Sequence, residues 1–376
     1  MKHSPVDAVV IGAGIVGAAC AEALTRAGLS VAIVEPGIVG GGTSAAGMGH
    51  ILVLDDSDAR FALTSYSRRL WLERAPEFPA KTDFARIGTV WIAADGEDYA
   101  AAKAKHQFAQ ERGFRTELLD ARRLYELEPN LRPGLLGGLR VLDDAIVYTP
   151  LAARWLVDQA CRAGATLLLG ASAAAIREGS LLLADGSEIP AGVIVNAAGT
   201  AASALTPEVP VEPKKGHLVI TEPRPGFLHH ELIELAYLKS AHSAAGDSVA
   251  FNLQPRPNGQ ILIGSCRQPG HGDAAIEHAI LSRMVRRALD YMPRLAPIQA
   301  LRVWTGLRPA TPDNVPVIGP HPHRPGLYFA TGHEGMGISA ALGTGQLLAD
   351  SIQGRETAIP IDPYLPDRFF TEASND

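Results

Sequence analysis

Three glycines near the start of the chain have the spacing of a phosphate-binding turn. Gly12, Gly14 and Gly17 form G-x-G-x-x-G. The first glycine of this pattern allows a tight turn, the second lets the backbone approach a pyrophosphate, and the third lets a helix pack closely on a strand. The helix N-terminus offers unpaired N–H groups and a positive dipole end to the phosphates. Such binding requires a strand directly before the glycines and a helix directly after them.

The flanking residues predict both elements. Asp7–Ile11 is a short β-branched run typical of a buried strand, and apolar residues recur at helical spacing within 16–28. A second strand, Val31–Val34, ends in Glu35, whose carboxylate can accept hydrogen bonds from ribose hydroxyls. An acid at this position disfavours a 2′-phosphate, so FAD or NAD is expected rather than NADP.

Further glycine-rich segments favour FAD over NAD. Residues 37–51 form a glycine-rich loop with Thr43 and Ser44, which suits backbone that lies against a large flat ligand. A predicted strand at Val193–Asn196 leads into a turn of small residues, Ala197–Gly199. Both features are expected of a chain that binds a flavin.

The last of these segments joins a strand near Leu327–Ala330, a glycine loop and a helix from about Ile338. Gly335-x-Gly337-x-x-Ala340 resembles a second nucleotide fingerprint, but no strand ending in an acid follows the helix. We expect the helix N-terminus to face the negative charge that a reduced flavin carries at its pyrimidine end. Electrons would then come from the substrate and not from NAD(P)H.

One arginine lies among turn-forming and apolar residues in "TGLRPATPDNVPVIG". This residue, Arg308, is a permanent cation in a segment that otherwise carries little charge. It is expected to meet an anion. A structural ion pair is the alternative.

Together these segments resemble the D-amino-acid oxidase/glycine oxidase superfamily of FAD enzymes over almost the whole chain. The resemblance rests on "VVIGAGIVGAACAEAL", "GGGTSAAGMGH", "VIVNAAG", "KKGHLVIT", "GLRPATPDNVPVIG" and "TGHEGMGI". Within the superfamily the chain is most similar to the catalytic β subunits of hydroxyproline and opine dehydrogenases. The resemblance implies FAD-dependent oxidation of the C–N bond of an amino or imino acid, by hydride transfer to flavin, in a hetero-oligomer with electron-transfer subunits. A glycine or sarcosine oxidase that produces hydrogen peroxide and a non-catalytic flavin-binding subunit are the alternatives.

The resemblance also implies roles for particular residues. Arg308 corresponds to the arginine that pairs with the substrate carboxylate. His50 is expected either to contact the substrate or flavin or to bond to backbone, and Glu334 either to meet the substrate amine or to bond loop N–H groups. The predicted flavin contacts are Gly12, Gly14, Ile15, Val16, Gly17, Glu35, Pro36, Gly42, Thr43, Ser44, Gly47, Gly49, Ala198, Gly199, Gly306, Gly332, Gly335, Met336, Gly337 and Ile338.

Departures from the family pattern carry information too. Leu307 and Ala46 stand where some relatives attach flavin through a cysteine or a histidine, so non-covalent FAD is expected. Gly47 replaces an asparagine of many relatives, and Gly335 replaces a second arginine that some relatives use to clamp the carboxylate. The choice of substrate therefore stays open.

The scattered flavin segments predict an α/β fold with a discontinuous Rossmann-like FAD-binding domain of residues 1–80, 145–215 and 300–376. Residues 81–144 and 216–299 are expected to form a second, antiparallel-sheet α+β domain that binds substrate where the two domains meet. This domain includes predicted helices at Ala100–Arg112 and Ala275–Met292, and a hairpin that turns at Asn258-Gly259.

The remaining features narrow the function class. A net charge of −6 without a Lys/Arg run argues against nucleic acid, and the absence of zinc-type Cys/His spacing argues against a metal. Three scattered cysteines argue against disulfides, and no apolar run reaches the ~18–20 residues of a membrane span. A cytoplasmic location is expected, with peripheral attachment to the inner face of a membrane left open. Tyr237 and His242 are expected to be structural, with a segment that covers the site as the alternative. Lys215 is expected to be a solvated charge at a strand end.

Overall fold

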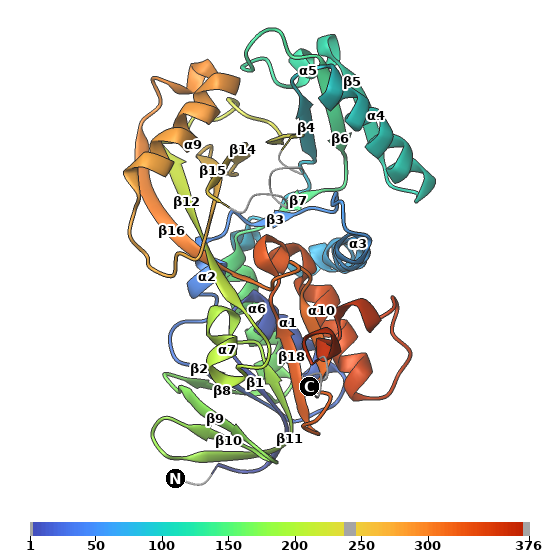
Figure 1. Ribbon diagram of the computed structural model, residues 1–376, viewed down its shortest axis with the longest axis vertical. Coiled ribbons are helices and arrows are strands. Elements are labelled where there is room, and N and C mark those ends of the chain that lie inside the picture. Colours follow the sequence, from blue (N-terminus) through green and yellow to red (C-terminus); the bar gives the residue numbers. More distant parts are fainter. Residues whose placement is uncertain (1–2, 237–245, 371–376) are drawn as a thin grey trace, which may run out of the picture. The chain divides into compact units, whose positions relative to one another are not determined.

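The protein has two compact units, each built from separate stretches of chain. In this computed structural model, residues 3–236 and 246–370 are described, and Tyr237 and His242 lie outside them. Unit 1 comprises Met1–Thr82, Tyr148–Pro213 and Arg308–Asp376, and unit 2 comprises Asp83–Val147 and Lys214–Leu307 (Figure 1).

Unit 1 is built on a largely parallel sheet. Its strand order is β17-β18-β11-β1-β2-β8, and β9 and β10 extend it from β11. The pairs along β18-β11-β1-β2-β8 are parallel, whereas β17 pairs with β18 in the antiparallel sense. The central strands have no polar alternation because both of their faces are buried. The strands are β1 (Val6–Ile11), β2 (Val31–Glu35), β8 (Thr166–Leu169), β9 (Ala173–Arg177), β10 (Ser180–Leu183), β11 (Glu188–Asn196), β17 (Val317–Pro320) and β18 (Leu327–Thr331).

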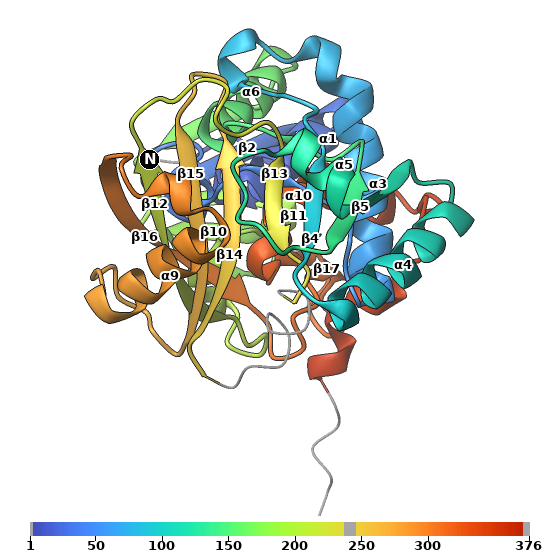
Figure 2. The same cartoon turned by 90° about the horizontal axis from the view of Figure 1, so that it is seen from above.

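Four long helices belong to unit 1: α1 (Ile15–Arg26), α3 (Asp58–Arg74), α6 (Thr149–Arg162) and α10 (Gly337–Ile352). Helices α1 and α10 lie side by side (Figures 1 and 2). Their close approach requires Gly345, where a Cβ atom would stand 2.5 Å from the carbonyl oxygen of Ala19. This packing fixes the start of α10 relative to the start of α1.

Unit 2 is built on an eight-stranded sheet of order β16-β12-β15-β14-β13-β4-β6-β5. The predicted hairpin is confirmed: β14 and β15 are antiparallel, and Gly259 in their turn has φ +84°. The prediction of an antiparallel sheet needs one correction, because β13 pairs with β4 in the parallel sense. These two strands are far apart in the chain, so no tight turn imposes an antiparallel pairing. The strands are β4 (Thr89–Ala93), β5 (Thr116–Asp120), β6 (Gly137–Val141), β12 (Glu212–Thr221), β13 (Glu231–Glu234), β14 (Ser248–Pro255), β15 (Ile261–Pro269) and β16 (Ala300–Ala310).

One face of this sheet carries the core of unit 2. Helix α9 (His278–Tyr291) lies against β14 and β15, as Figures 1 and 2 show. Its Met284 joins Val90, Phe251 and Ile263 in one buried apolar cluster. The other α-helices of this unit among the described residues are α4 (Gly96–Glu111) and α5 (Ala121–Leu127).

Lys215 is buried, which overturns the prediction of a solvated charge. Its side chain is 0% exposed, and its Nζ lies 3.1 Å from Asp273 Oδ1 and 2.6 Å from Glu277 Oε1. Burial alone would lower the pKa of Lys215, but the hydrogen bonds to these two carboxylates outweigh it and raise the pKa. The carboxylates come from the segment that leads into α9, about 60 residues further along the chain, so local sequence gives no sign of them.

Glu234 connects the sheet of unit 2 to α9. Its carboxylate accepts hydrogen bonds from the Phe251 N–H and from Tyr291 Oη, and it pairs with Arg287. Replacing Glu234 by alanine leaves the buried Phe251 N–H and Tyr291 hydroxyl without their acceptor and breaks the pair with Arg287, so we expect a loss of about 3–5 kcal/mol in the free energy of unfolding. Urea denaturation measures this loss. The control is Glu126→Ala, which breaks an exposed pair with Arg122 and should cost about 0.5 kcal/mol or less; equal losses in both variants would contradict the assignment.

Candidate active site

The glycine fingerprint forms the turn between β1 and α1. Gly12 has φ +101°, and a Cβ atom on it would stand 2.7 Å from the carbonyl oxygen of Ala197. A Cβ atom on Gly17 would stand 2.0 Å from the carbonyl oxygen of Gly12. Only glycine is compatible with such contacts. The residue that precedes α1 is Gly14, which has no side chain and so cannot cap the helix.

Glu35 ends β2 beside this turn. Its Oε2 accepts a hydrogen bond from the Ala13 N–H at 2.8 Å, and its Oε1 accepts one from the Gly37 N–H at 2.8 Å. The backbone thus fixes the carboxylate at the edge of the fingerprint. Because each oxygen has a further lone pair, the group retains capacity to accept from ribose hydroxyls. Pro36 follows it at the surface.

The predicted glycine loop contains a short helix, α2 (Gly42–Ala46), which the sequence analysis did not anticipate. Ser44 Oγ in this helix accepts a hydrogen bond from the Ile15 N–H at 2.9 Å, so α2 is tied to the first turn of α1. Thr43 lies in the same helix. The glycines at either end of α2 had suggested a loop, but residues 43–46 contain no helix breaker.

The loop before α10 lies beside the fingerprint and α2. A Cβ atom on Gly337 would lie 3.8 Å from Val16 Cγ2, in the first turn of α1. A Cβ atom on Gly47 would lie 3.0 Å from Ile338 Cδ1. The structure therefore brings the fingerprint, α2 and the start of α10 together within unit 1. Helix α10 begins after Met336, whose side chain does not cap the helix.

The turn after β11 also borders the fingerprint. Ala198 precedes the 3₁₀ turn Gly199–Ala201, and Gly199 has φ +58°. Thr331 at the end of β18 donates a hydrogen bond to the carbonyl oxygen of Gly199 at 3.4 Å. Gly49, in the segment after α2, has φ +93°, and Gly332, after β18, has φ +74°. The positive φ angles explain why these positions hold glycine.

Glu334 has an unusual backbone for a non-glycine residue, with φ +50°. Its side chain is buried, and Oε2 accepts a hydrogen bond from the Gly335 N–H at 2.5 Å. Bonding to a loop N–H, one of the two expected roles, is thus present. A left-handed conformation at a buried acid stores local strain, and such strain is concentrated at functional sites.

Arg308 lies near the end of β16, with Gly306 two residues before it in the same strand. Two residues after Arg308, Ala310 forms an isolated β-bridge with His333. This end of β16 therefore lies beside the loop that precedes α10. A Cβ atom on Gly332 would also stand 2.5 Å from Thr311 Cγ2. Arg308 is half-buried.

Two histidines belong to these segments. His50 opens β3 (His50–Ile51), is half-buried, and accepts a hydrogen bond at its carbonyl oxygen from Ser339 Oγ at 3.1 Å. His333, which sequence reasoning did not select, is buried with Nε2 2.9 Å from Thr344 Oγ1. Burial lowers the pKa of His333 to about 3, so its imidazole is neutral at physiological pH. The only sign in the sequence that His333 belongs to these segments was its position between Gly332 and Glu334.

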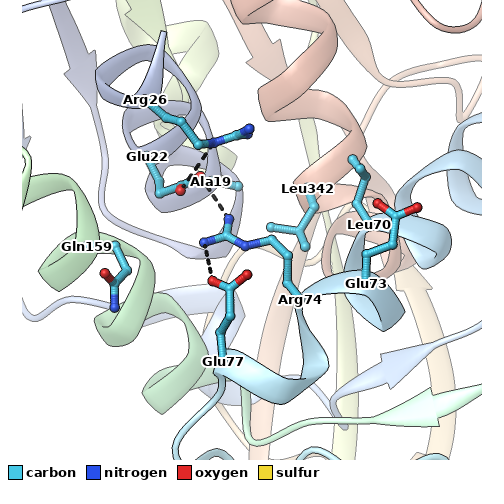
Figure 3. Close-up of a pocket in the computed structure, with 9 residues that line it drawn as sticks. All are labelled: Ala19, Glu22, Arg26, Leu70, Glu73, Arg74, Glu77, Gln159 and Leu342. Carbon is cyan, nitrogen blue, oxygen red and sulfur yellow. Dashed lines mark hydrogen bonds and ion pairs between the residues drawn. The ribbon is translucent and has the colours of Figure 1, made fainter. Parts of the chain in front are cut away.

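A separate cavity of about 460 Å³ lies elsewhere in unit 1 (Figure 3). It is lined by side chains of α1, α3, α6 and α10 and includes none of the predicted site residues. Every charged group that lines it has a charged partner: Arg74 Nη1 lies 2.9 Å from Glu22 Oε2, Arg26 Nε lies 3.4 Å from Glu22 Oε1, Glu77 pairs with Arg74, and Glu73 pairs with Arg69 outside the lining. The pairing accounts for the charges without a ligand.

Within residues 3–236 and 246–370, no three His, Cys, Asp or Glu side chains come together as a metal site. No helix in that part of the chain has both the length and the apolar character needed to cross a bilayer.

The chain is similar to several known proteins over almost its whole length. Glycine oxidase of Geobacillus kaustophilus is 28% identical over 95% of this chain and 96% of its own, and its crystal structure matches with a TM-score of 0.86. Hydrogen cyanide synthase subunit HcnC of Pseudomonas aeruginosa is 28% identical over 97% of each chain. The structure of L-proline dehydrogenase from P. horikoshii matches with a TM-score of 0.88 at 25% identity, over 98% of this chain and 99% of that one.

The family model described as FAD dependent oxidoreductase matches residues 7–351. This range contains the fingerprint, Glu35, Arg308 and the start of α10. The match covers most of the chain, and the protein therefore belongs to the family of FAD-dependent oxidoreductases.

Proposed function

We propose that this protein oxidises the C–N bond of an amino or imino acid, with FAD held non-covalently in unit 1. The observation that carries the proposal is the convergence of the fingerprint, Glu35 and the start of α10 within that unit. FAD supplies a two-electron acceptor for the substrate's α-hydrogen. The glycine oxidase and L-proline dehydrogenase named above support an amino or imino acid as the substrate.

The residues of unit 1 fit the parts of FAD. The close contacts at Gly12 and Gly17 fix the turn before the N-terminus of α1, where a pyrophosphate is proposed to bind. Glu35 is held by two backbone N–H groups in a position suited to ribose hydroxyls. The N-terminus of α10 provides a positive dipole end for negative charge on the pyrimidine ring. Leu307 and Ala46 offer no atom for covalent attachment.

Arg308 orients the substrate in this proposal. Its guanidinium accepts a carboxylate in bidentate geometry, which fixes the position of the α-carbon. A substrate that binds as the neutral amine needs no protein base, and His333 stays neutral without taking a proton at physiological pH. Glu334 is proposed to accept from the substrate amine, in addition to its bond with the Gly335 N–H.

We also propose that the protein works in a hetero-oligomer with electron-transfer subunits. The support is its similarity over 97% of each chain to a protein named as a subunit, HcnC. Similarity to glycine oxidases supports direct reaction with oxygen as the alternative. Comparing reoxidation of the reduced protein by air and by an artificial electron acceptor separates the two.

The purified protein is expected to be yellow and to lose its flavin absorbance anaerobically when the right substrate is added. The panel consists of D-amino acids, sarcosine, L- and D-proline, hydroxyproline isomers and opines. Dithionite serves as the control that the bound flavin can be reduced. A protein whose flavin responds to dithionite but to no amino or imino acid, with or without partner chains, would overturn the proposal in favour of a non-catalytic subunit.

A further inference from the structure

The loop that follows the Arg308 strand is held by the C-terminal part of the chain. This loop, residues 311–316, joins β16 to β17 and begins three residues after Arg308. The residue that holds it is Arg368, in the 3₁₀ turn η7 (Pro366–Phe369). Arg308, the loop and Arg368 all belong to unit 1, so the contacts between them lie within one compact unit.

Every nitrogen of the Arg368 guanidinium donates a hydrogen bond. Nε donates to Asp313 Oδ2 at 2.7 Å, and Nη2 donates to the carbonyl oxygens of Val315 at 2.7 Å and Pro316 at 3.2 Å. Nη1 donates to the carbonyl oxygen of Leu365, just before its own turn, at 2.7 Å. The planar fork of an arginine can hold two backbone segments together in this way, whereas the ammonium of a lysine is a point charge.

The loop is also bonded internally, so the contact with Arg368 fixes more than one of its residues. Thr311 Oγ1 donates to the Val315 carbonyl oxygen at 2.8 Å, and Asp313 Oδ1 accepts from the Val315 N–H at 3.1 Å. Asn314 has φ +57°, a left-handed conformation that asparagine adopts more readily than most residues. Burial alone would raise the pKa of Asp313, but the hydrogen bonds from Arg368 and from the Val315 N–H outweigh it and lower the pKa.

The turn that carries Arg368 is itself anchored. Tyr364, two residues before η7, is 1% exposed, and its Oη donates to the carbonyl oxygen of Ala59 in α3 at 2.6 Å. Leu365 lies against β17, where a Cβ atom on Gly319 would stand 2.7 Å from Leu365 Cδ2. Arg368 therefore extends from a fixed base, and its hydrogen bonds fix the loop relative to that base.

On its other side the loop borders the candidate active site. Its first residue, Thr311, follows Ala310, which forms the β-bridge with His333. Thr311 is 2% exposed, and its Cγ2 would lie 2.5 Å from a Cβ atom on Gly332. Arg308 is two residues before Ala310 in the same strand. Because the backbone of a strand sets the direction of its side chains, a displaced loop would also displace the Arg308 guanidinium.

We propose that Arg368 is a positioning residue for the substrate carboxylate: it holds the loop after Arg308 so that the Arg308 guanidinium lies where the carboxylate binds. Arg368 acts through Arg308 and does not touch the substrate. A misplacement of about 1 Å can cost about 100-fold in rate even when the mutated residue is far from the reacting atoms. This inference rests on the proposed function and adds a second arginine on which its substrate binding depends.

The first test separates KM from kcat in Arg368→Ala, with the panel member that bleaches the wild-type flavin fastest as substrate. We expect KM to rise about 10- to 100-fold, while kcat changes less than about twofold and the flavin content stays complete. Arg368→Lys cannot reach all the acceptors at once, so its KM should lie between those of the wild type and Arg368→Ala. Anaerobic flavin reduction at varied substrate concentration, well below the melting temperature of each variant, measures both constants.

The matched control is Arg324→Ala. Arg324 is a half-buried arginine of the same unit that also bonds a carboxylate and a backbone carbonyl, with Nη1 3.4 Å from Glu208 Oε1 and Nη2 2.9 Å from the Ile176 carbonyl oxygen. Its loss should lower the melting temperature but leave KM unchanged. If KM rises equally in Arg324→Ala and Arg368→Ala, it reports a general loss of stability and the inference fails.

The second test asks whether Arg368 acts through Arg308. In a chain that already carries Arg308→Ala, the added Arg368→Ala should lower kcat/KM by less than about twofold, because the group that Arg368 positions is absent. Two residues that act independently would instead give changes that multiply. Full multiplication of the two effects would overturn the inference.

The outcomes separate this inference from the proposed function. A wild-type flavin that an amino or imino acid bleaches, together with an unchanged KM in Arg368→Ala, refutes the inference and leaves the proposed function standing. If Arg368→Ala does not fold, Arg368→Lys and Asp313→Asn take its place, and each must raise KM more than Arg324→Ala does. A flavin that no amino or imino acid bleaches refutes the proposed function, and the inference with it.

Discussion

Replacing Arg308 by alanine is expected to lower kcat/KM for the amino or imino acid substrate by about 100- to 10,000-fold. The variant loses a bidentate, charge-assisted pair with the carboxylate, and a loss of this size corresponds to about 3–6 kcal/mol at 1.4 kcal/mol per tenfold. Most of the loss should appear as a higher KM, because the carboxylate is bound equally in the ground state and the transition state. Anaerobic flavin reduction at varied substrate concentration measures both constants.

Two further variants make this result specific. Arg308→Lys keeps the charge but not the planar fork, so its kcat/KM should lie between those of the wild type and the alanine variant. Arg302→Ala removes an exposed arginine from the same strand and should change neither constant. All three variants should retain flavin in full. Unchanged kinetics in Arg308→Ala would remove this residue from the site and leave the structural ion pair as its role.

Several helices, strands and turns were predictable because their sequence signals are local. A short β-branched run, a glycine turn and a helical repeat predicted β1 and α1, which the structure confirms at Val6–Ile11 and Ile15–Arg26. The helix expected over Ala275–Met292 is α9, His278–Tyr291, and the Asn258-Gly259 turn joins β14 and β15 as expected. In each case the residue propensities, the apolar periodicity and the turn residues of a segment of about twenty residues predict the same structure. Tertiary contacts therefore did not change the local preference.

Features that depend on distant partners were not predictable. The solvated role expected of Lys215 was wrong, because its two carboxylate partners come from the segment before α9. The parallel pairing of β13 with β4 joins two strands that are far apart along the chain. The left-handed backbone of Glu334 was also not foreseen, since the residue type alone favours other conformations. Strand pairing and burial determine all three features, and neither can be predicted from a local sequence pattern.

Gly17→Ala tests whether the glycine fingerprint holds the cofactor. The added Cβ atom would stand 2.0 Å from the carbonyl oxygen of Gly12, so the phosphate-binding turn must move away from α1. Overpacking of this kind costs about 1–3 kcal/mol. If this cost falls on the conformation that binds FAD, FAD should bind about 5- to 150-fold more weakly. The ratio of flavin to protein absorbance after purification, and the Kd from FAD titration of the apoprotein, report the change.

The matched control is Gly192→Ala in β11. Its Cβ atom would meet nothing closer than the Asp7 carbonyl oxygen at 3.7 Å, an ordinary contact, so flavin content should match the wild type. Glu35→Gln tests the same site through different chemistry, because it keeps the shape of the acid but removes the charge that favours bonds from ribose hydroxyls. If both Gly17→Ala and Glu35→Gln bind FAD as tightly as the wild type, the fingerprint does not hold the cofactor. If only Glu35→Gln does, the turn binds the pyrophosphate and Glu35 serves chiefly to hold the Ala13 and Gly37 N–H groups.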